Sequence, residues 1–356
     1  RETHRPHEGI DLAVYYDPIH SANVDRMLAA FGHALDYYQP AFGPYQFRQA
    51  RIIEFPDYAR FAQAFAGTMP YSEGIGFIAD LSDPDKIDYV TYVAAHELGH
   101  QWWAHQAVGA DVQGSTMLTE TLAQYSALMV MEKLYGRDQI RRFLKFELDN
   151  YLKARGGEAI EELPLDRVED QPYIHYRKGS LVMYRLKDEL GEARVNAALK
   201  RYVTRYRFKG APYPRSLDLI AEFRKGATAS ENALISDLFD RITLYDIKTK
   251  AAATAKRPDG HWRTVLTVEA HKLYADGRGK EREAPMNETA EVGLFSAMPG
   301  RGKFAARDVL LLDRVPIRSG VQTVTLVSKA RPAFAGTDPY NTRIDRNSDD
   351  NVIATE

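Results

Sequence analysis

The residues whose types and spacing could do chemistry lie at positions 96–100, which read His-Glu-Leu-Gly-His. On an α-helix, His96 and His100 are four residues apart and project from the same face, one turn apart. Two imidazoles arranged in this way can bind one Zn²⁺ ion, and Glu97 beside them can take a proton from a zinc-bound water molecule. The pattern therefore predicts a zinc hydrolase.

A catalytic zinc site needs a third protein ligand and one open position for water. Because the chain contains no cysteine, the third ligand must be a carboxylate or another histidine. Glu120 is the best candidate, since nineteen residues separate it from His100 and let the next helix fold back. Alternatively, Glu120 binds no metal, and its negative charge only interacts with the positive N-terminal end of that helix. His105 is a rival, but it points about 140° around the helix from His100, away from a shared ion.

The composition describes an ordinary globular protein with two domains, because 356 residues exceed one typical core. Hydrophobic residues make up 44% and charged residues 27% of the chain. The net charge of −2 gives no electrostatic reason to expect nucleic acid as a partner. No apolar run approaches the ~18 residues of a membrane helix. The chain starts with Arg and shows no signal peptide, which suggests a piece of a longer protein, and nothing indicates an oligomeric state.

The elements that must position these residues follow from hydrophobic periodicity. In the first part of the chain, strands are expected at 11–16, 48–55 and 74–79 and a helix at 21–39. The helix that carries the histidines is expected from about 86 to 106, and Asp83-Pro84-Asp85 indicates its start. Helical patterns then continue to about residue 246.

The hydrophobic pattern of the chain changes after residue 246. Short segments rich in Val, Leu and Thr follow, separated by turn residues, at 262–270, 289–297, 308–313 and 322–329. This pattern predicts an antiparallel β-sandwich. The polar tail 338–351 is expected to wrap the surface or to be mobile. The predicted fold class is α+β, with a catalytic domain at 1–245 and a β-sandwich at 246–356.

Two motifs resemble the aminopeptidase N and leukotriene hydrolase family of gluzincin zinc metallopeptidases. The runs His96-Glu-Leu-Gly-His-Gln-Trp-Trp and Thr119-Glu-Thr-Leu-Ala-Gln-Tyr are similar to the family's His-Glu-Leu-x-His-Gln-Trp-Trp-Gly-Asn and Asn-Glu-Gly-Phe-Ala-x-Tyr. The resemblance implies a thermolysin-like catalytic domain, peptide substrates, and one zinc ion. It assigns the ion to His96, His100 and Glu120 and the general base to Glu97.

Two further roles follow from the resemblance. Tyr176-Arg-Lys-Gly is similar to the family's Tyr-Glu-Lys-Gly, which implies that Tyr176 stabilises the oxyanion. A buried structural tyrosine is the alternative. Glu73 stands where the family's Gly-x-Met-Glu-Asn motif has the glutamate that binds the substrate's free α-amine. Its alternative is a solvated turn acid or a partner in a salt bridge.

Three departures from the family matter. The spacing from His100 to Glu120 is one residue longer than usual, which indicates an insertion within 104–118. Gly74 replaces the asparagine of the exopeptidase motif, and the family's N-terminal β-saddle and large C-terminal helical domains are missing. Three functions remain open: an aminopeptidase on short peptides, which is favoured, an endopeptidase at the same site, and a peptide-binding or sensory module of a transporter.

Segments 42–47 and 54–65 resemble peptidase-like domains fused to bacterial ABC-type permeases. This resemblance implies a bacterial, soluble domain that is fused to or tethered by a membrane permease, with the extracytoplasmic side favoured. It also explains why residue 1 is not a natural start.

Overall fold

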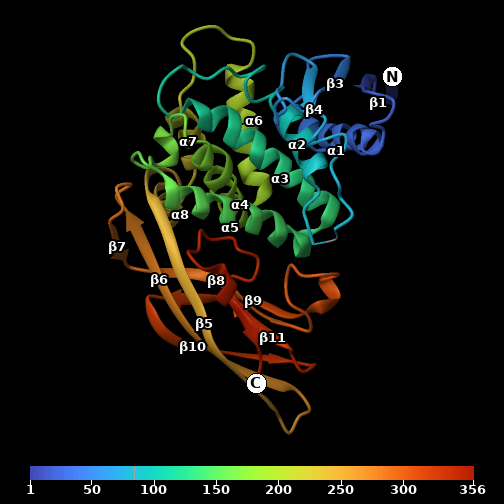
Figure 1. Ribbon diagram of the computed structural model, residues 1–356. Helices are drawn as coiled ribbons and strands as arrows, with labels where there is room; N and C mark the ends of the chain where they lie inside the picture. Colours follow the sequence, from blue (N-terminus) through green and yellow to red (C-terminus); the bar gives the residue numbers. More distant parts are fainter. Residues whose placement is uncertain (84) are drawn as a thin grey trace. The chain divides into compact units, whose positions relative to one another are not determined.

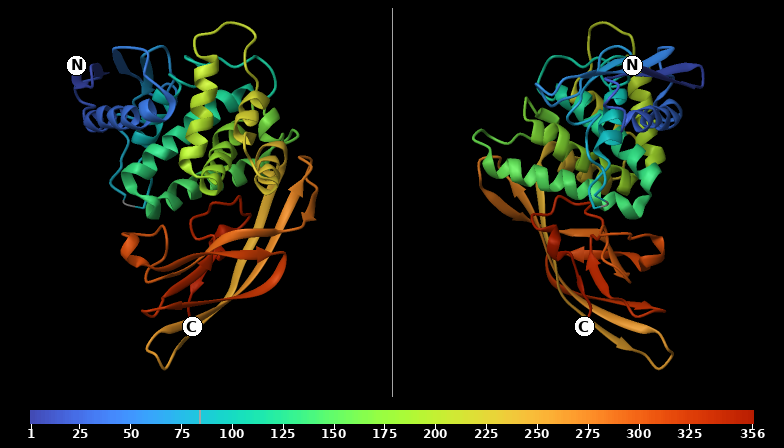
Figure 2. Two further views of the ribbon diagram at one scale, coloured as in Figure 1. Left: turned by 180° about the vertical axis from the view of Figure 1, so that it is seen from behind. Right: turned by 45° about the vertical axis from the view of Figure 1, so that its right-hand side comes forward.

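The computed structural model describes residues 1–83 and 85–356. Pro84, one of the residues expected to start the helix of the histidines, lies outside the described residues. Residues that pack together form two compact units. Unit 1 comprises residues 1–134 and 164–240, and unit 2 comprises 135–163 and 241–356 (Figures 1 and 2). Each unit is therefore built from two separate stretches of the chain.

Unit 1 contains a four-stranded sheet with the order β1-β2-β3-β4 (Figure 1). Its strands are β1 Glu2–His7, β2 Ile10–Tyr15, β3 Gln49–Phe55 and β4 Thr68–Ser72. The first pair is antiparallel, and β3 lies parallel to both β2 and β4. The strands expected at 11–16 and 48–55 thus correspond to β2 and β3.

The prediction of a strand at 74–79 is wrong, because β4, the last strand of this sheet, ends at Ser72, before Glu73. Residues 73–78 form turns, in which the N–H of Ile78 donates to the carbonyl of Glu73 at 3.0 Å. The backbone at Gly74 lies so close to Asp57 that a Cβ there would be 2.5 Å from its carboxyl group. Glu73 therefore follows a strand instead of preceding one.

Segment 61–65 pairs with the outer edge of β4 and so extends the sheet. The N–H of Gln63 donates to the carbonyl of Pro70, and the N–H of Ser72 donates to the carbonyl of Phe61, both at 3.1 Å. Ala62 lies opposite Tyr71 in an antiparallel bridge. Both edges of β4 are therefore paired within the chain, one with β3 and the other with segment 61–65.

The rest of unit 1 is helical. Its α-helices are α1 Val24–Phe42, α2 Tyr89–Gly99, α3 Leu122–Tyr135, α5 Gly179–Leu190, α6 Glu192–Tyr206, α7 Ser216–Arg224 and α8 Ala229–Ile235. Three π-helical turns precede or follow them: η1 Met117–Thr121, η3 Tyr173–Lys178 and η4 Ser236–Asp240. Within the described residues, we find no helix that is both long and apolar enough to cross a membrane.

Helix α2 is shorter than expected at both ends. It begins after Asp88, whose side chain accepts a hydrogen bond from the N–H of Thr91 at 3.1 Å, as an N-cap does. It ends at Gly99, and the chain then turns because the N–H of His105 bonds back to the carbonyl of His100 at 3.1 Å. Ala104 in this turn has a φ of 142°, which a helix cannot accommodate.

Unit 2 contains two four-stranded sheets, with the orders β10-β6-β5, in which β7 pairs with β6, and β12-β11-β8-β9. The strands are β5 Ile242–Lys256, β6 Trp262–Ala275, β7 Glu281–Ala284, β8 Asn287–Phe295, β9 Val309–Arg318, β10 Gly320–Ser328, β11 Phe334–Thr337 and β12 Val352–Ala354. Buried side chains of both sheets, including Ile247, Leu266, Val292 and Ile317, form one core. The α+β class with a β-sandwich is confirmed.

Helix α4, Arg137–Gly157, groups with these strands. Tyr340 donates from its hydroxyl to Asp138 at 2.9 Å, and Arg141 donates to the carbonyl of Pro339. The N–H of Glu162 donates to the carbonyl of Gly277 at 2.9 Å. The division at residue 245 expected from the sequence places this helix with the catalytic domain instead.

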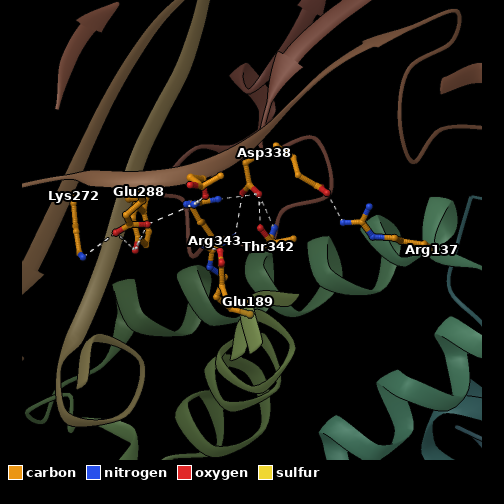
Figure 3. A network of polar contacts seen from close by, with 11 residues as sticks. Arg137, Glu189, Lys272, Glu288, Asp338, Thr342 and Arg343 are labelled. Carbon is orange, nitrogen blue, oxygen red and sulfur yellow. Dashed lines mark hydrogen bonds and ion pairs between the residues drawn. The ribbon is translucent and has the colours of Figure 1, made fainter. Parts of the chain in front are cut away.

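Of the two expectations for the tail 338–351, the structure agrees with a tail that packs against its own unit and not with a mobile one, because residues 338–345 are buried. Asp338 accepts from the backbone N–H groups of Thr342 at 3.1 Å and Arg343 at 3.0 Å (Figure 3). Arg343 is 1% exposed and donates to the carbonyl of Thr289 at 2.8 Å. These internal bonds compensate the carboxylate of Asp338 and one guanidinium nitrogen of Arg343 for the loss of water.

Candidate active site

The two histidines and Glu120 converge on one point in unit 1. Helix α2 carries His96, His100 is the C-cap residue that directly follows it, and the π-turn η1 carries Glu120. The Nε2 atoms of the two histidines lie 3.1 Å apart. One carboxylate oxygen of Glu120 lies 3.3 Å from His96 Nε2 and 3.2 Å from His100 Nε2. Both histidine residues are 7% exposed.

This triangle has the size that a zinc ion requires. Tetrahedral coordination with bonds of about 2.0–2.1 Å places neighbouring ligand atoms about 3.3 Å apart. The Nδ1–H of His100 donates to the carbonyl of Trp103 at 3.1 Å, which leaves Nε2 as the lone-pair donor. The residues present therefore fit a Zn²⁺ ion, with three protein ligands from two histidines and one carboxylate.

The charges of the three groups also favour a cation between them. Burial raises the pKa of Glu120, but hydrogen bonds and charge from His100 and His96 outweigh it and hold that pKa far below its usual range. Burial lowers the pKa of His100, but Glu120 outweighs it and raises that pKa to about 9. The Glu120 carboxylate and the two imidazoles therefore attract positive charge to the point between them.

Glu97 lies beside the histidines on α2 and lines the same pocket as His96 and Tyr176. Its side chain is 6% exposed, and burial raises its pKa above the usual value although the imidazoles oppose this. A carboxylate with a raised pKa is a stronger base than one in water. Its place and its basicity suit the transfer of a proton in this pocket.

Tyr176 comes to the site on the π-turn η3, and its ring centre lies 5.7 Å from that of His96. Burial raises its pKa well above the usual value, and the charge of Glu120 adds to this. The phenol therefore keeps its proton at neutral pH and can donate a hydrogen bond. π-Helical turns are rare and are frequent at functional sites.

The turns that carry Glu120 and Tyr176 are fixed to each other. The hydroxyl of Thr121 in η1 donates to the carbonyl of His175 in η3 at 2.6 Å. Gly179 follows η3, and a Cβ at this position would lie 2.4 Å from the Thr121 hydroxyl. Glycine therefore permits the close approach of the two turns, and the hydrogen bond fixes their relative position.

The structure places Glu73 in a different set of contacts. Its carboxylate accepts the N–H of Asp57 at 3.0 Å and lies 3.6 Å from His20 Nδ1. His20 also bonds to Glu54 at 2.5 Å. Ile75 lines the pocket, and Glu73 does not appear among the described residues that line it.

His105, the rival ligand, contacts the carbonyl of Ala64 at 3.4 Å through Nε2. It belongs to none of the metal-sized clusters found among the described residues. Because α2 ends at Gly99, the position of His105 follows from the turn at Ala104 and not from the helical repeat assumed in the sequence analysis.

Sequence reasoning missed several groups of the site. It named Trp103 only as part of a motif, whereas in the structure the carbonyl of Trp103 accepts a hydrogen bond from His100. It gave no role to Thr121, and no sequence signal indicates its bond to His175. It also missed that Phe61 and Ala62 line the pocket, because they lie in a segment without a clear period.

The profile of the peptidase family M1 domain matches residues 27–242. Human endoplasmic reticulum aminopeptidase 2 is 26% identical over 211 residues, which cover 57% of this chain and 22% of the relative. Aminopeptidase N of Lactococcus lactis subsp. cremoris is 24% identical over 229 residues, which cover 60% of this chain and 26% of the relative. The chain thus spans about a quarter of the length of these curated relatives.

A solved structure of Legionella pneumophila aminopeptidase A, in complex with aspartic acid, has a similar fold. The TM-score is 0.59 at 15% sequence identity, and the match covers 96% of this chain and 37% of that chain. At this identity the likeness establishes the fold alone.

Proposed function

Because the chain belongs to peptidase family M1, we propose that it is a zinc-dependent aminopeptidase that removes N-terminal residues from peptides. The resemblance to the aminopeptidase N family inferred from the motifs is thereby confirmed. The observation that carries the proposal is the triangle of His96, His100 and Glu120, with sides of 3.1–3.3 Å, beside Glu97 and Tyr176.

A zinc ion on this triangle would supply Lewis acidity, which can lower the pKa of a water molecule from ~15.7 towards ~7. Glu97 accepts the proton of the attacking water and then delivers it to the leaving amine. The phenol of Tyr176 donates a hydrogen bond to the substrate's carbonyl oxygen as that oxygen gains negative charge. Loss of one such donor typically lowers the rate by ~10²–10³.

Glu73 would bind the free amino group of the substrate, as its sequence position implies. Its contacts with the Asp57 backbone and His20 instead favour a second candidate, an endopeptidase that uses the same zinc ligands and general base. An endopeptidase does not need a group that recognises the free amine. The aminopeptidase remains the first choice because the relatives of this chain are named as aminopeptidases.

The test uses zinc-loaded protein with free peptides and their N-acetylated counterparts. We expect hydrolysis of the free peptides, loss of activity with a chelator, and almost no activity of Glu97→Gln. Glu158→Gln, an exposed residue of unit 2, is the matched control and should keep the activity. Equal hydrolysis of blocked peptides would favour the endopeptidase. Tight peptide binding without turnover would instead support a peptide-binding or sensory module.

Fusion to a membrane permease, and tethering on its extracytoplasmic side, stay predictions from the resemblance of segments 42–47 and 54–65. Bacterial origin has the same basis. Peptides are the partners that the proposed activity requires.

A further inference from the structure

Three side chains outside the proposed zinc site meet at one end of the unit 1 sheet. Strands β2, β3 and β4 run parallel to one another, so the chain leaves all three at the same end. His20 lies in the segment between β2 and α1, Glu54 lies near the end of β3, and Glu73 directly follows β4. In open α/β sheets, ligands bind outside the carboxyl ends of such parallel strands.

The polar atoms of these side chains converge on one point. The Nδ1 atom of His20 lies 2.5 Å from one oxygen of Glu54 and 3.6 Å from one oxygen of Glu73. The three atoms all lie within 4.8 Å of one another. A zinc ion with bonds of about 2.0–2.2 Å holds neighbouring ligand atoms about 3.3 Å apart, which is a value between the two measured distances. Small side-chain movements therefore suffice to place one ion among the three atoms.

The backbone orients both carboxylates toward His20. The N–H of Asp17 donates to the other oxygen of Glu54 at 2.5 Å. The N–H of Asp57 donates to the other oxygen of Glu73 at 3.0 Å. Outer hydrogen bonds of this kind orient the ligands of protein metal sites. Each carboxylate thus has one oxygen fixed by the backbone and presents the second oxygen to the imidazole.

The charges of this cluster are not balanced by the side chains around it. Within residues 1–83 and 85–356, neither Glu54 nor Glu73 has a Lys or Arg partner. The Nδ1 atom of His20 carries at most one proton, which can serve only one of the two carboxylates. The side chains of His20, Glu54 and Glu73 are only 20%, 7% and 24% exposed, so water screens their charges incompletely. A divalent cation would neutralise both carboxylates, which a single proton cannot do.

We propose that His20, Glu54 and Glu73 bind a second Zn²⁺ ion, separate from the ion of the proposed active site. Imidazole nitrogens and carboxylate oxygens are the ligands that zinc uses in proteins where thiolates are absent. Three protein ligands leave the fourth tetrahedral position to a water molecule, which the partial exposure of His20 and Glu73 admits. The ion would connect the segment after β2, the end of β3 and the turn after β4. Because Glu73 is also the residue proposed to bind the amine of a substrate, the ion and the amine would compete for its carboxylate.

The test counts the zinc ions bound to the full chain and to two histidine variants. Each protein is first freed of metal with a chelator and then dialysed to equilibrium against Zn²⁺. His20→Gln removes one ligand of the second ion. His4→Gln is the matched control, because the imidazole of His4 also contacts two carboxylates, of Asp11 at 2.9 Å and of Glu2 at 3.7 Å. His4 nevertheless belongs to none of the metal-sized clusters found in the described part of the chain.

We expect the unaltered chain and His4→Gln to bind one zinc ion more than His20→Gln does. In His20→Gln the affinity for the second ion should fall roughly 100-fold or more, since even the loss of an outer partner of a metal ligand typically costs 10–100-fold. The ion of the proposed active site contributes equally to all three proteins. If that site binds no zinc, all three counts fall by one and the difference between them stays, so the two proposals fail separately.

Crystals of the unaltered chain grown with zinc give a second measurement, which stays decisive even if His20→Gln fails to fold. Anomalous scattering at the zinc absorption edge should show a peak between Nδ1 of His20 and the carboxylates of Glu54 and Glu73. Equal zinc counts in the three proteins would overturn the site. An anomalous map without a peak at these three side chains would do the same.

Discussion

Ala104 holds a backbone conformation that an L-residue with a Cβ rarely adopts. Its φ is 142°, and it lies in the turn that ends α2, just after the two histidines of the proposed zinc site. Glycine adopts such angles without steric cost, and the aminopeptidase N motif has glycine at this position. The substitution of alanine for glycine therefore leaves strain at the edge of the site.

We expect Ala104→Gly to raise the free energy of unfolding by about 1 kcal/mol, because relief of strain exceeds the added entropy of the unfolded chain. Urea unfolding measures the change. Ala197→Gly is the control, since Ala197 is exposed within α6, where glycine should cost about 1 kcal/mol. The same destabilisation in both variants would show that Ala104 is not strained.

The sequence predicted that two of the proposed zinc ligands lie close together, because the helical repeat fixes their relative position. His96 and His100 share a face whenever the segment is helical, and the structure brings their Nε2 atoms to 3.1 Å. Glu73 is different, because its partners depend on the segment around Asp57 and on His20, neither of which follows a periodic pattern. Its sequence position alone could not predict these contacts.

At the scale of elements, the site depends on how closely two π-turns approach each other. Gly179 faces Thr121, whose hydroxyl holds the turn of Tyr176 against the turn of Glu120. An added Cβ would lie 2.4 Å from that hydroxyl, so the turns must separate to admit it. Their separation would move the proposed zinc ligand Glu120 and the proposed oxyanion donor Tyr176 together.

We expect Gly179→Ala to lower the free energy of unfolding by about 1–3 kcal/mol, the usual cost of overpacking, and to weaken zinc binding. Zinc titration and urea unfolding of the same samples measure both effects. Gly156→Ala is the matched control, because it lies near the end of α4 with open space around its Cβ position. If Gly179→Ala matched this control in both measurements, the close approach would have no role in the site.

Periodicity predicted which elements exist better than it predicted their ends. The segment of α2 was recognised, but its end at Gly99 depends on the backbone bond between His105 and His100. The strand expected at 74–79 failed because turns at Gly74 and Gly76 follow β4, and apolar residues between glycines resemble a strand. The π-turns also escaped notice, since they interrupt the 3.6-residue repeat only locally.

At the scale of the whole molecule, the chain passes between the two units three times, because residues 135–163 belong to unit 2. A single domain boundary near residue 245, as the sequence predicted, therefore separates residues 135–163 from the rest of unit 2. Helix α4 would lose the partners of Asp138 and Arg141, which are Tyr340 and the carbonyl of Pro339. The sequence could not predict this arrangement, because composition changes near residue 246 and gives no signal at 135.

We expect a fragment of residues 1–245 to melt at a lower temperature than the full chain, since it leaves buried side chains and hydrogen-bonding groups of α4 without their partners. Circular dichroism of both proteins during heating measures the difference. A fragment that melts cooperatively at the temperature of the full chain would show that α4 does not need the sandwich.

The stability of unit 2 should fall as the pH rises, because it buries Asp345 completely. Burial raises the pKa of this carboxyl to about 8, although N–H groups of Asn347 and Ile247 donate to it at 3.0 and 3.2 Å. An unfolded aspartate has a pKa of about 3.9. Between about pH 4 and 8 the folded state therefore holds a proton that the unfolded state has lost, and the free energy of unfolding decreases by up to about 1.4 kcal/mol per pH unit. Asp345→Asn removes this titration, so its stability relative to the unaltered chain should increase from pH 4 to 8 and then stay constant. Urea unfolding of both proteins across this range measures the difference, and a difference that does not change with pH would mean that Asp345 is ionised in the folded protein.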